Sequence, residues 1–193
     1  MRRLRVSAVA ALAGQLALTS LPALAMTVER LEVGESTPGY FVEFEATLSA
    51  PAAAVMSVLQ EYASYPGLDT RIVVARIVGE QDGRPLLYTR LRGCLAAWFC
   101  RDMDRYELLE EGDRLLVARA VPGRGDLRSG LSETRVEPAG QDRARVRYST
   151  HFEPSFWMPR WLVRSAMVRT LESGTLAMFE NVEARARARE ATP

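Results

Sequence analysis

The stretch that follows Pro159 constrains the fold more than any other part of the chain. Between Pro159 and about Arg185 there is one glycine and no further proline. The residues of one stripe recur at spacings of three and four, which is typical of an amphipathic helix. They are Val163, Met167, Val168, Leu171, Gly174, Thr175, Met178 and Val182. About 25 residues at 1.5 Å per residue make a helix of about 38 Å. A helix this long must bury its stripe against an extended partner surface.

The segment before this helix has the alternation of β-strands. Residues 40–48 and 144–152 alternate apolar and polar side chains, as half-buried strands do. Further strand-like runs lie between them, separated by turn signals near 82–83, 111–113 and 138–140. One short helix, which starts near Pro51 and stops at Tyr65-Pro66-Gly67, follows the first of these strands. The pattern predicts about six to seven strands in an antiparallel meander.

The order of elements indicates the fold class. A strand, a short helix, a run of antiparallel strands and one long helix fit together when the sheet curves around the long helix. We therefore predict an α+β protein with a helix-grip fold, in which a curved antiparallel sheet of about six to seven strands wraps around the C-terminal helix. The domain is expected at 40–185, after an N-terminal extension at 26–39 and before a polar tail at 186–193.

The first 25 residues have the features of a secretory signal peptide. Arg2, Arg3 and Arg5 precede an apolar run that ends in Ala23-Leu24-Ala25, a small-x-small cleavage site. An uncleaved membrane anchor is the alternative, because the run approaches the roughly 20 residues that a span needs. We expect cleavage and a location in the bacterial periplasm or outside the cell. Removal of three arginines and no acidic residue changes the net charge from +1 to −2, which does not favour nucleic-acid binding.

The chain has two cysteines, Cys94 and Cys100, in the stretch GCLAAWFC. The C-x5-C spacing and the single histidine, His151, do not favour a zinc site, and C-x-x-C redox chemistry is absent. If the chain reverses near 96–97, the two cysteines lie opposite each other on antiparallel strands, within disulfide range. For an exported chain we expect a disulfide-stapled hairpin; two free thiols are the alternative.

Two stretches resemble the START-like superfamily, also called SRPBCC, which includes lipid-transfer domains and the polyketide cyclase/coenzyme-Q-binding group. ATLSAPAAAVMSVLQEYASYPG matches the strand, Ala-Pro, helix and Tyr-Pro stop of that superfamily. RVRYSTHFEPSFWMPRWLVRSAM matches its last strand, proline and long helix. The resemblance covers about 40–185. These motifs are patterns rather than invariant residues, so they indicate the fold better than the ligand.

The resemblance implies a cavity between the sheet and the long helix for a hydrophobic small molecule, such as a lipid or a quinone. The residues expected to line it are Phe44, Leu91, Met103, Tyr148, Phe152, Trp161, Met167, Leu171, Gly174 and Met178. Gly174 costs about 1 kcal/mol relative to alanine inside a helix, so it needs a reason. Room for a ligand and close packing on the sheet are both open.

The strand after Cys100 has charges on both faces, so its pattern does not indicate which face points inward. One interpretation is a solvated outer sheet with cross-strand Arg–Asp pairs. The other is that Arg101 or Arg105 points into the cavity and holds a carboxylate or phosphate headgroup.

An aromatic cluster, Phe156, Trp157 and Trp161, lies where the last strand passes into the long helix. It is expected either to contact a membrane transiently or to close the end of the core.

Three functions are consistent with these features. The first is a monomeric periplasmic module that binds and transfers a hydrophobic small molecule. The second is an enzyme of the polyketide cyclase/aromatase type, and the third is a ligand-free interaction domain. The sequence offers no catalytic constellation, cofactor motif or metal-ligand cluster.

Overall fold

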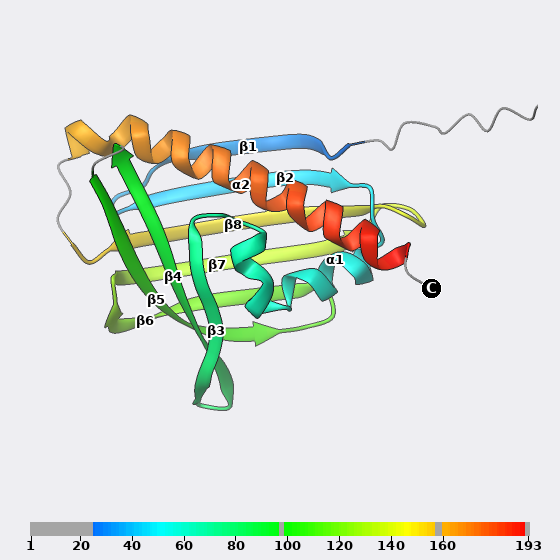
Figure 1. Ribbon diagram of the computed structural model, residues 1–193, viewed down its shortest axis with the longest axis horizontal. Coiled ribbons are helices and arrows are strands. Elements are labelled where there is room, and N and C mark those ends of the chain that lie inside the picture. Colours follow the sequence, from blue (N-terminus) through cyan, green and yellow to red (C-terminus); the bar gives the residue numbers. More distant parts are fainter. Residues whose placement is uncertain (1–24, 97–98, 157–159, 192–193) are drawn as a thin grey trace, which may run out of the picture.

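A computed structural model describes residues 25–96, 99–156 and 160–191. Over these residues the chain forms one antiparallel sheet in the spatial order β1-β2-β8-β7-β6-β5-β4-β3 (Figure 1). The strands are β1 (Thr27–Glu35), β2 (Tyr40–Leu48), β3 (Ile72–Gln81), β4 (Arg84–Ala96), β5 (Phe99–Glu111), β6 (Leu115–Gly125), β7 (Leu127–Pro138) and β8 (Ala144–Pro154). The helix α1 (Ala52–Leu59) and the 3-10 helix η1 (Tyr62–Gly67) connect β2 to β3.

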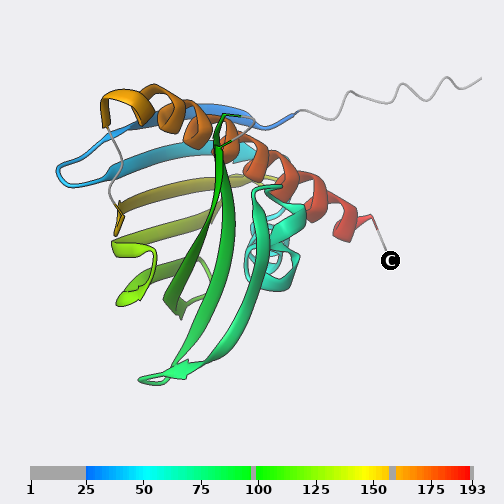
Figure 2. The same cartoon turned by 60° about the vertical axis from the view of Figure 1, so that its left-hand side comes forward.

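The long helix α2 (Arg160–Glu190) lies across the concave face of the sheet (Figures 1 and 2). Its orange N-terminal end is beside the tip of the β4–β5 hairpin, and its red C-terminal end is beside α1. This arrangement confirms the predicted α+β helix-grip fold.

The sheet has one more strand than the upper limit of the prediction. Residues 27–35, which the pattern assigned to an N-terminal extension, form β1 and pair antiparallel with β2 from Thr27↔Thr47 to Glu35↔Tyr40. A register shift between Val28 and Arg30 interrupts the alternation in β1. A bulge of this kind hides a strand from a test for period two.

The C-terminal helix also continues beyond the predicted end near Arg185. Ala186 is fully buried, and Arg189 donates from Nη1 to Ser57 Oγ on α1 at 2.6 Å. The Ala-Arg alternation of this segment gives a weak helical stripe, so the sequence pattern resembles a polar tail although the helix reaches Glu190.

The main core lies where the C-terminal half of α2 meets β2, β8 and α1. Phe179 is fully buried, and its ring stacks on that of Phe44 at a centroid distance of 4.7 Å. Val182 packs beside it, and the inward residues of β2 and α1 complete the cluster, among them Leu48 and Val55.

The expected signal peptide lies outside the described residues, apart from Ala25. No helix in the described part of the chain is long and apolar enough to cross a bilayer.

Candidate functional site

A cavity of about 650 Å³ lies between the concave face of the sheet and the N-terminal half of α2. Most of its lining side chains are apolar, and they come from β2 and from β4 to β8 as well as from α2. The volume is within the range of about 300–1,000 Å³ that is typical of small-molecule sites. The curvature of the sheet creates this space. The C-terminal end of α2 rests on the sheet, whereas the N-terminal end of α2 spans the concave side of the sheet (Figure 2).

The structure brings most of the expected lining residues to this cavity. Those that line it are Leu91, Met103, Tyr148, Phe152, Met167, Leu171, Gly174 and Met178. Phe44 instead lies in the main core against Phe179, because its position on β2 faces the C-terminal half of α2. The backbone of Trp161 is in α2, but its side chain lies outside the described part, as does the whole of Trp157.

The two faces of β5 correspond to the two interpretations of its charges. The inward face places Met103, Arg105 and Glu107 on the cavity. The outward face carries Asp104, which accepts hydrogen bonds from Arg90 Nε at 2.7 Å and from the Tyr88 hydroxyl at 2.9 Å. The hydrogen bond from the Arg90 guanidinium lowers the pKa of the Asp104 carboxyl below its ordinary value. The outer face of the sheet therefore carries cross-strand ion pairs, while Arg105 points into the cavity.

Arg105 and Glu107 form an ion pair inside the cavity, with the guanidinium Nη2 donating to the carboxylate Oε1. The Glu107 side chain is 4% exposed and that of Arg105 is 23% exposed. Burial on its own lowers the pKa of Arg105, but the Glu107 carboxylate together with the Tyr148 and Tyr65 side chains outweighs that effect, so the pKa is raised. Arg105 thus stays protonated in the wall of the cavity.

Hydroxyl groups surround this ion pair. Ser132 and Thr150 share a hydrogen bond of 2.7 Å between their hydroxyl oxygens, and Tyr148 lies beside them. Burial raises the pKa of the Tyr148 phenol, which keeps it protonated. Thr89 is opposite Arg105 in the β4–β5 ladder and also lines the cavity. We call Thr89, Arg105, Glu107, Ser132, Tyr148 and Thr150 the polar cluster.

The reason for Gly174 becomes clear from Arg71, a residue that no sequence motif marks. Arg71 Nη1 donates to the main-chain oxygen of Thr170 at 2.6 Å, and its Nε donates to Asp69 Oδ1 at 2.9 Å. A Cβ at position 174 would lie 1.6 Å from Arg71 Nη2. Gly174 therefore lines the cavity and also accommodates a guanidinium on the helix surface, a role beyond the two that were expected. A glycine in mid-helix was the only signal for this contact.

The outer end of the cavity is next to the tip of the β4–β5 hairpin. Cys94 and Cys100 pair opposite each other and form a disulfide with an S–S distance of 2.06 Å, which confirms the predicted stapled hairpin. Cys94 lines the cavity. Arg101 lies there too, with its guanidinium 4.0 Å from the centroid of the Phe156 ring and Nη2 3.4 Å from Asp126 Oδ1.

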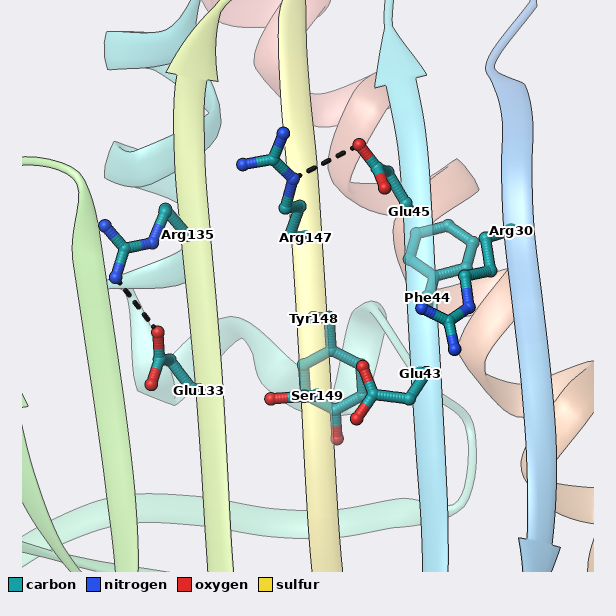
Figure 3. A pocket seen from close by; sticks show the side chains of 9 residues that line it. All are labelled: Arg30, Glu43, Phe44, Glu45, Glu133, Arg135, Arg147, Tyr148 and Ser149. Carbon is teal, nitrogen blue, oxygen red and sulfur yellow. Dashed lines mark hydrogen bonds and ion pairs between the residues drawn. The ribbon is translucent and has the colours of Figure 1, made fainter.

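A second, smaller hollow of about 220 Å³ lies over the outer face of β1, β2, β8 and β7 (Figure 3). Glu45 accepts from Arg147 Nε at 3.2 Å, and Glu133 accepts from Arg135 Nη2 at 3.1 Å, as the dashed lines in Figure 3 show. These pairs are largely exposed, and exposed pairs of this kind contribute little. We interpret this hollow as part of the solvated sheet surface rather than as a ligand site.

The described residues include no group of three or more His, Cys, Asp or Glu side chains arranged to hold a metal ion. The cavity can therefore be described by three properties: an apolar wall, one internal ion pair and a set of hydroxyl groups.

Several solved structures share this fold. The chain has a TM-score of 0.63 with the Zhui aromatase/cyclase from Streptomyces sp. R1128, with 17% identity, covering 77% of this chain and 94% of that one. It has a TM-score of 0.58 with human STARD10, with 14% identity, covering 84% of this chain and 76% of that one. It has a TM-score of 0.54 with a STAR-related lipid transfer protein from Xanthomonas axonopodis, with 20% identity, covering 81% and 98%.

A comparison with curated proteins found no match. Residues 42–187 match the family described as polyketide cyclase / dehydrase and lipid transport. This range runs from β2 almost to the end of α2 and contains the whole cavity. The chain therefore belongs to the polyketide cyclase / dehydrase and lipid transport family of the START-like superfamily.

Proposed function

We propose that this protein is a monomeric carrier that binds one hydrophobic small molecule in the cavity and transfers it through the periplasm. The observation that carries the proposal is the cavity of about 650 Å³ with a mainly apolar lining. Burial of about 300 Å² of ligand apolar surface contributes about 7 kcal/mol before the costs of association are subtracted. A wall of this kind therefore favours a lipid, a quinone or a similar molecule.

Two features support an exported location. The N-terminal residues have the pattern of a signal peptide. The Cys94–Cys100 disulfide is of the kind that persists in oxidising compartments. A soluble carrier in such a compartment would shield an apolar molecule from water between membranes. The half-buried ring of Phe156, at the outer end of the cavity, is a candidate for transient contact with a lipid surface.

Native mass spectrometry of the mature chain purified from periplasm tests this proposal. We expect a co-purifying hydrophobic molecule, or saturable uptake of added lipid by the delipidated protein. Ala118 on β6 lines the cavity, so Ala118→Trp should fill part of it and reduce uptake. Val78 on the edge strand β3 is 39% exposed and does not line the cavity, so Val78→Trp is the matched control. A wild-type chain that carries nothing and takes up no lipid would contradict the proposal.

The polar cluster favours a second candidate, a cyclase/aromatase-type enzyme. Arg105, Glu107 and Tyr148 are titratable and lie on one cavity, as catalysis on a bound polyketide would require. The discriminating measurement is the mass of the bound molecule before and after prolonged incubation. A carrier releases its ligand unchanged, whereas cyclisation with dehydration removes one water.

A further inference from the structure

We propose that the cavity selects ligands whose polar end is uncharged, a hydroxyl or a carbonyl, and that Glu107 is the residue that excludes anionic lipids. This inference rests on the proposed carrier function and adds a ligand class to it. It differs from the expectation that Arg101 or Arg105 holds a carboxylate or phosphate headgroup.

The first step is the charge balance of the lining. Each arginine on the described lining has its own carboxylate partner: Arg71 with Asp69, Arg92 with Asp102, Arg101 with Asp126, and Arg105 with Glu107. Among the described side chains, an anionic headgroup would therefore find no lining arginine whose charge is not already neutralised.

Second, the Arg105–Glu107 ion pair is the one that a ligand enclosed in the cavity would meet. Arg92 and Arg101 are more than half exposed, but Arg105 and Glu107 are 23% and 4% exposed. A carboxylate beside Arg105 would bring a second negative charge close to Glu107, away from bulk water, where like charges are poorly screened. Glu107 thus offsets the attraction that Arg105 alone would exert on an anion.

The third step is the hydrogen-bonding capacity that remains. The Nε of Arg105 and the Oγ1 of Thr89 are buried and have no hydrogen-bond partner. Thr89 and Arg105 face each other across the β4–β5 ladder, so these atoms belong to one place in the wall. The hydroxyls of Ser132, Thr150 and Tyr148 lie on the same cavity. A neutral hydroxyl or carbonyl can exchange hydrogen bonds with the hydroxyls that line the cavity without adding a charge.

The test compares two ligands that differ only at the polar end. Delipidated mature protein is loaded with the neutral fluorophore N-phenyl-1-naphthylamine, which is then displaced with 1-hexadecanol or with hexadecanoate at pH 8. We expect the wild type to bind hexadecanol at least about tenfold more tightly than hexadecanoate. Equal binding, or tighter binding of hexadecanoate, would overturn the inference and leave the carrier function standing. Failure to bind the fluorophore and both ligands would instead contradict the carrier function.

Glu107→Gln sharpens this test because it removes the charge and keeps the size of the side chain. With Arg105 no longer neutralised, affinity for hexadecanoate should rise about tenfold while that for hexadecanol changes little. Glu110→Gln is the matched control, since Glu110 is on the same strand, is exposed and pairs with Arg84 away from the cavity. An unchanged ligand preference in a folded Glu107→Gln protein would refute the role of Glu107. The double variant Arg105→Gln/Glu107→Gln, which has neither charge, should still prefer hexadecanol; a preference for hexadecanoate would also refute it.

Discussion

The two halves of α2 belong to the same helix but have different surroundings. In the C-terminal half, 176–190, Phe179, Val182 and Ala186 are fully buried in the main core. Asn181 Nδ2 also donates to the main-chain oxygen of Leu68 at 2.9 Å. In the N-terminal half, the apolar side chains of Met167 and its neighbours face the cavity and are only partly buried.

This difference indicates that stability and ligand binding depend on separate parts of one element. The C-terminal half is fixed by core packing and by polar contacts to η1 and α1, including that of Arg185 with the main-chain oxygen of Ser64. Among the described residues, the polar contacts of Arg71 with Thr170 and of Arg164 with Glu35 hold the N-terminal half. The N-terminal half is therefore held to the rest of the molecule by less core packing than the C-terminal half.

The largest expected effect compares one residue from each half. Phe179→Ala should lower the free energy of unfolding by about 3–5 kcal/mol, because it leaves a void in a packed core. Met167→Ala should cost clearly less, since one side of Met167 already faces the cavity, and should mainly change ligand affinity. Urea unfolding and fluorophore displacement measure the two quantities. Equal losses of stability would mean that the N-terminal half is packed as tightly as the C-terminal half.

Removal of the disulfide should have the next largest effect. Cys94→Ser/Cys100→Ser opens a short loop and should lower the free energy of unfolding by about 2 kcal/mol. The hairpin tip lies beside the N-terminal half of α2, so ligand release should also become faster (Figure 1). The wild type in reductant should behave like the variant, whereas reductant should leave the variant unchanged. A reduced wild type with the stability of the oxidised protein would contradict this prediction.

Gly174→Ala tests the contact at the junction of the halves. Alanine gains about 1 kcal/mol over glycine within a helix. Here its Cβ would displace the Arg71 guanidinium from Thr170, and a charge-assisted hydrogen bond of this kind contributes about 1.5–3 kcal/mol. We therefore expect Gly174→Ala to destabilise the wild type by about 1 kcal/mol.

The same substitution should have the opposite sign without Arg71. In an Arg71→Ala background, Gly174→Ala should stabilise the protein by about 1 kcal/mol, because only the helix propensity changes. The double-mutant cycle measured by urea unfolding gives the coupling energy between the two positions. A coupling energy near zero would show that Arg71 does not depend on the absence of a side chain at Gly174.

Sequence patterns predicted the elements with regular periods and missed contacts that join distant segments. The alternation of β2 and β8 and the spacing along α2 were sufficient for the helix-grip fold. The inward positions on α2 and on the strands correctly predicted most of the cavity lining. Phe44 lies in the core instead, because the sequence pattern does not show where along α2 the cavity ends. Arg71 was missed because nothing local links it to Thr170, 99 residues away. Partners of this kind depend on the tertiary fold.

The inward orientation of Arg105 and Glu107 was also beyond sequence patterns. Both faces of β5 carry charges, so hydrophobic alternation cannot identify the buried face. The inward face of β5 is identified by its pairing with the neighbouring strand β4. Asp102 and Asp104 form ion pairs with Arg92 and Arg90 of β4, which leaves the face with Arg105 and Glu107 to point inward.

The outer face of β5 supplies the smallest expected effect and a reference for the cavity pair. Asp104→Asn removes the carboxylate that accepts from Arg90 and Tyr88, and the Arg90 guanidinium remains accessible to water. With the solvent screening of a side chain that is about one-third exposed, we expect a loss of less than about 1 kcal/mol at pH 7.

The pKa of Asp104 is lowered in the folded state, chiefly by the Arg90 hydrogen bond. The contribution of the Asp104 carboxylate to folding stability is therefore present above its unfolded-state pKa of about 3.9. It is lost as the pH falls through its folded-state pKa. The stabilities of the wild type and the variant, measured by urea unfolding, should converge as the pH falls below the folded-state pKa of Asp104. A difference that persists there would mean that the amide disturbs the packing of Tyr88 rather than the ion pair.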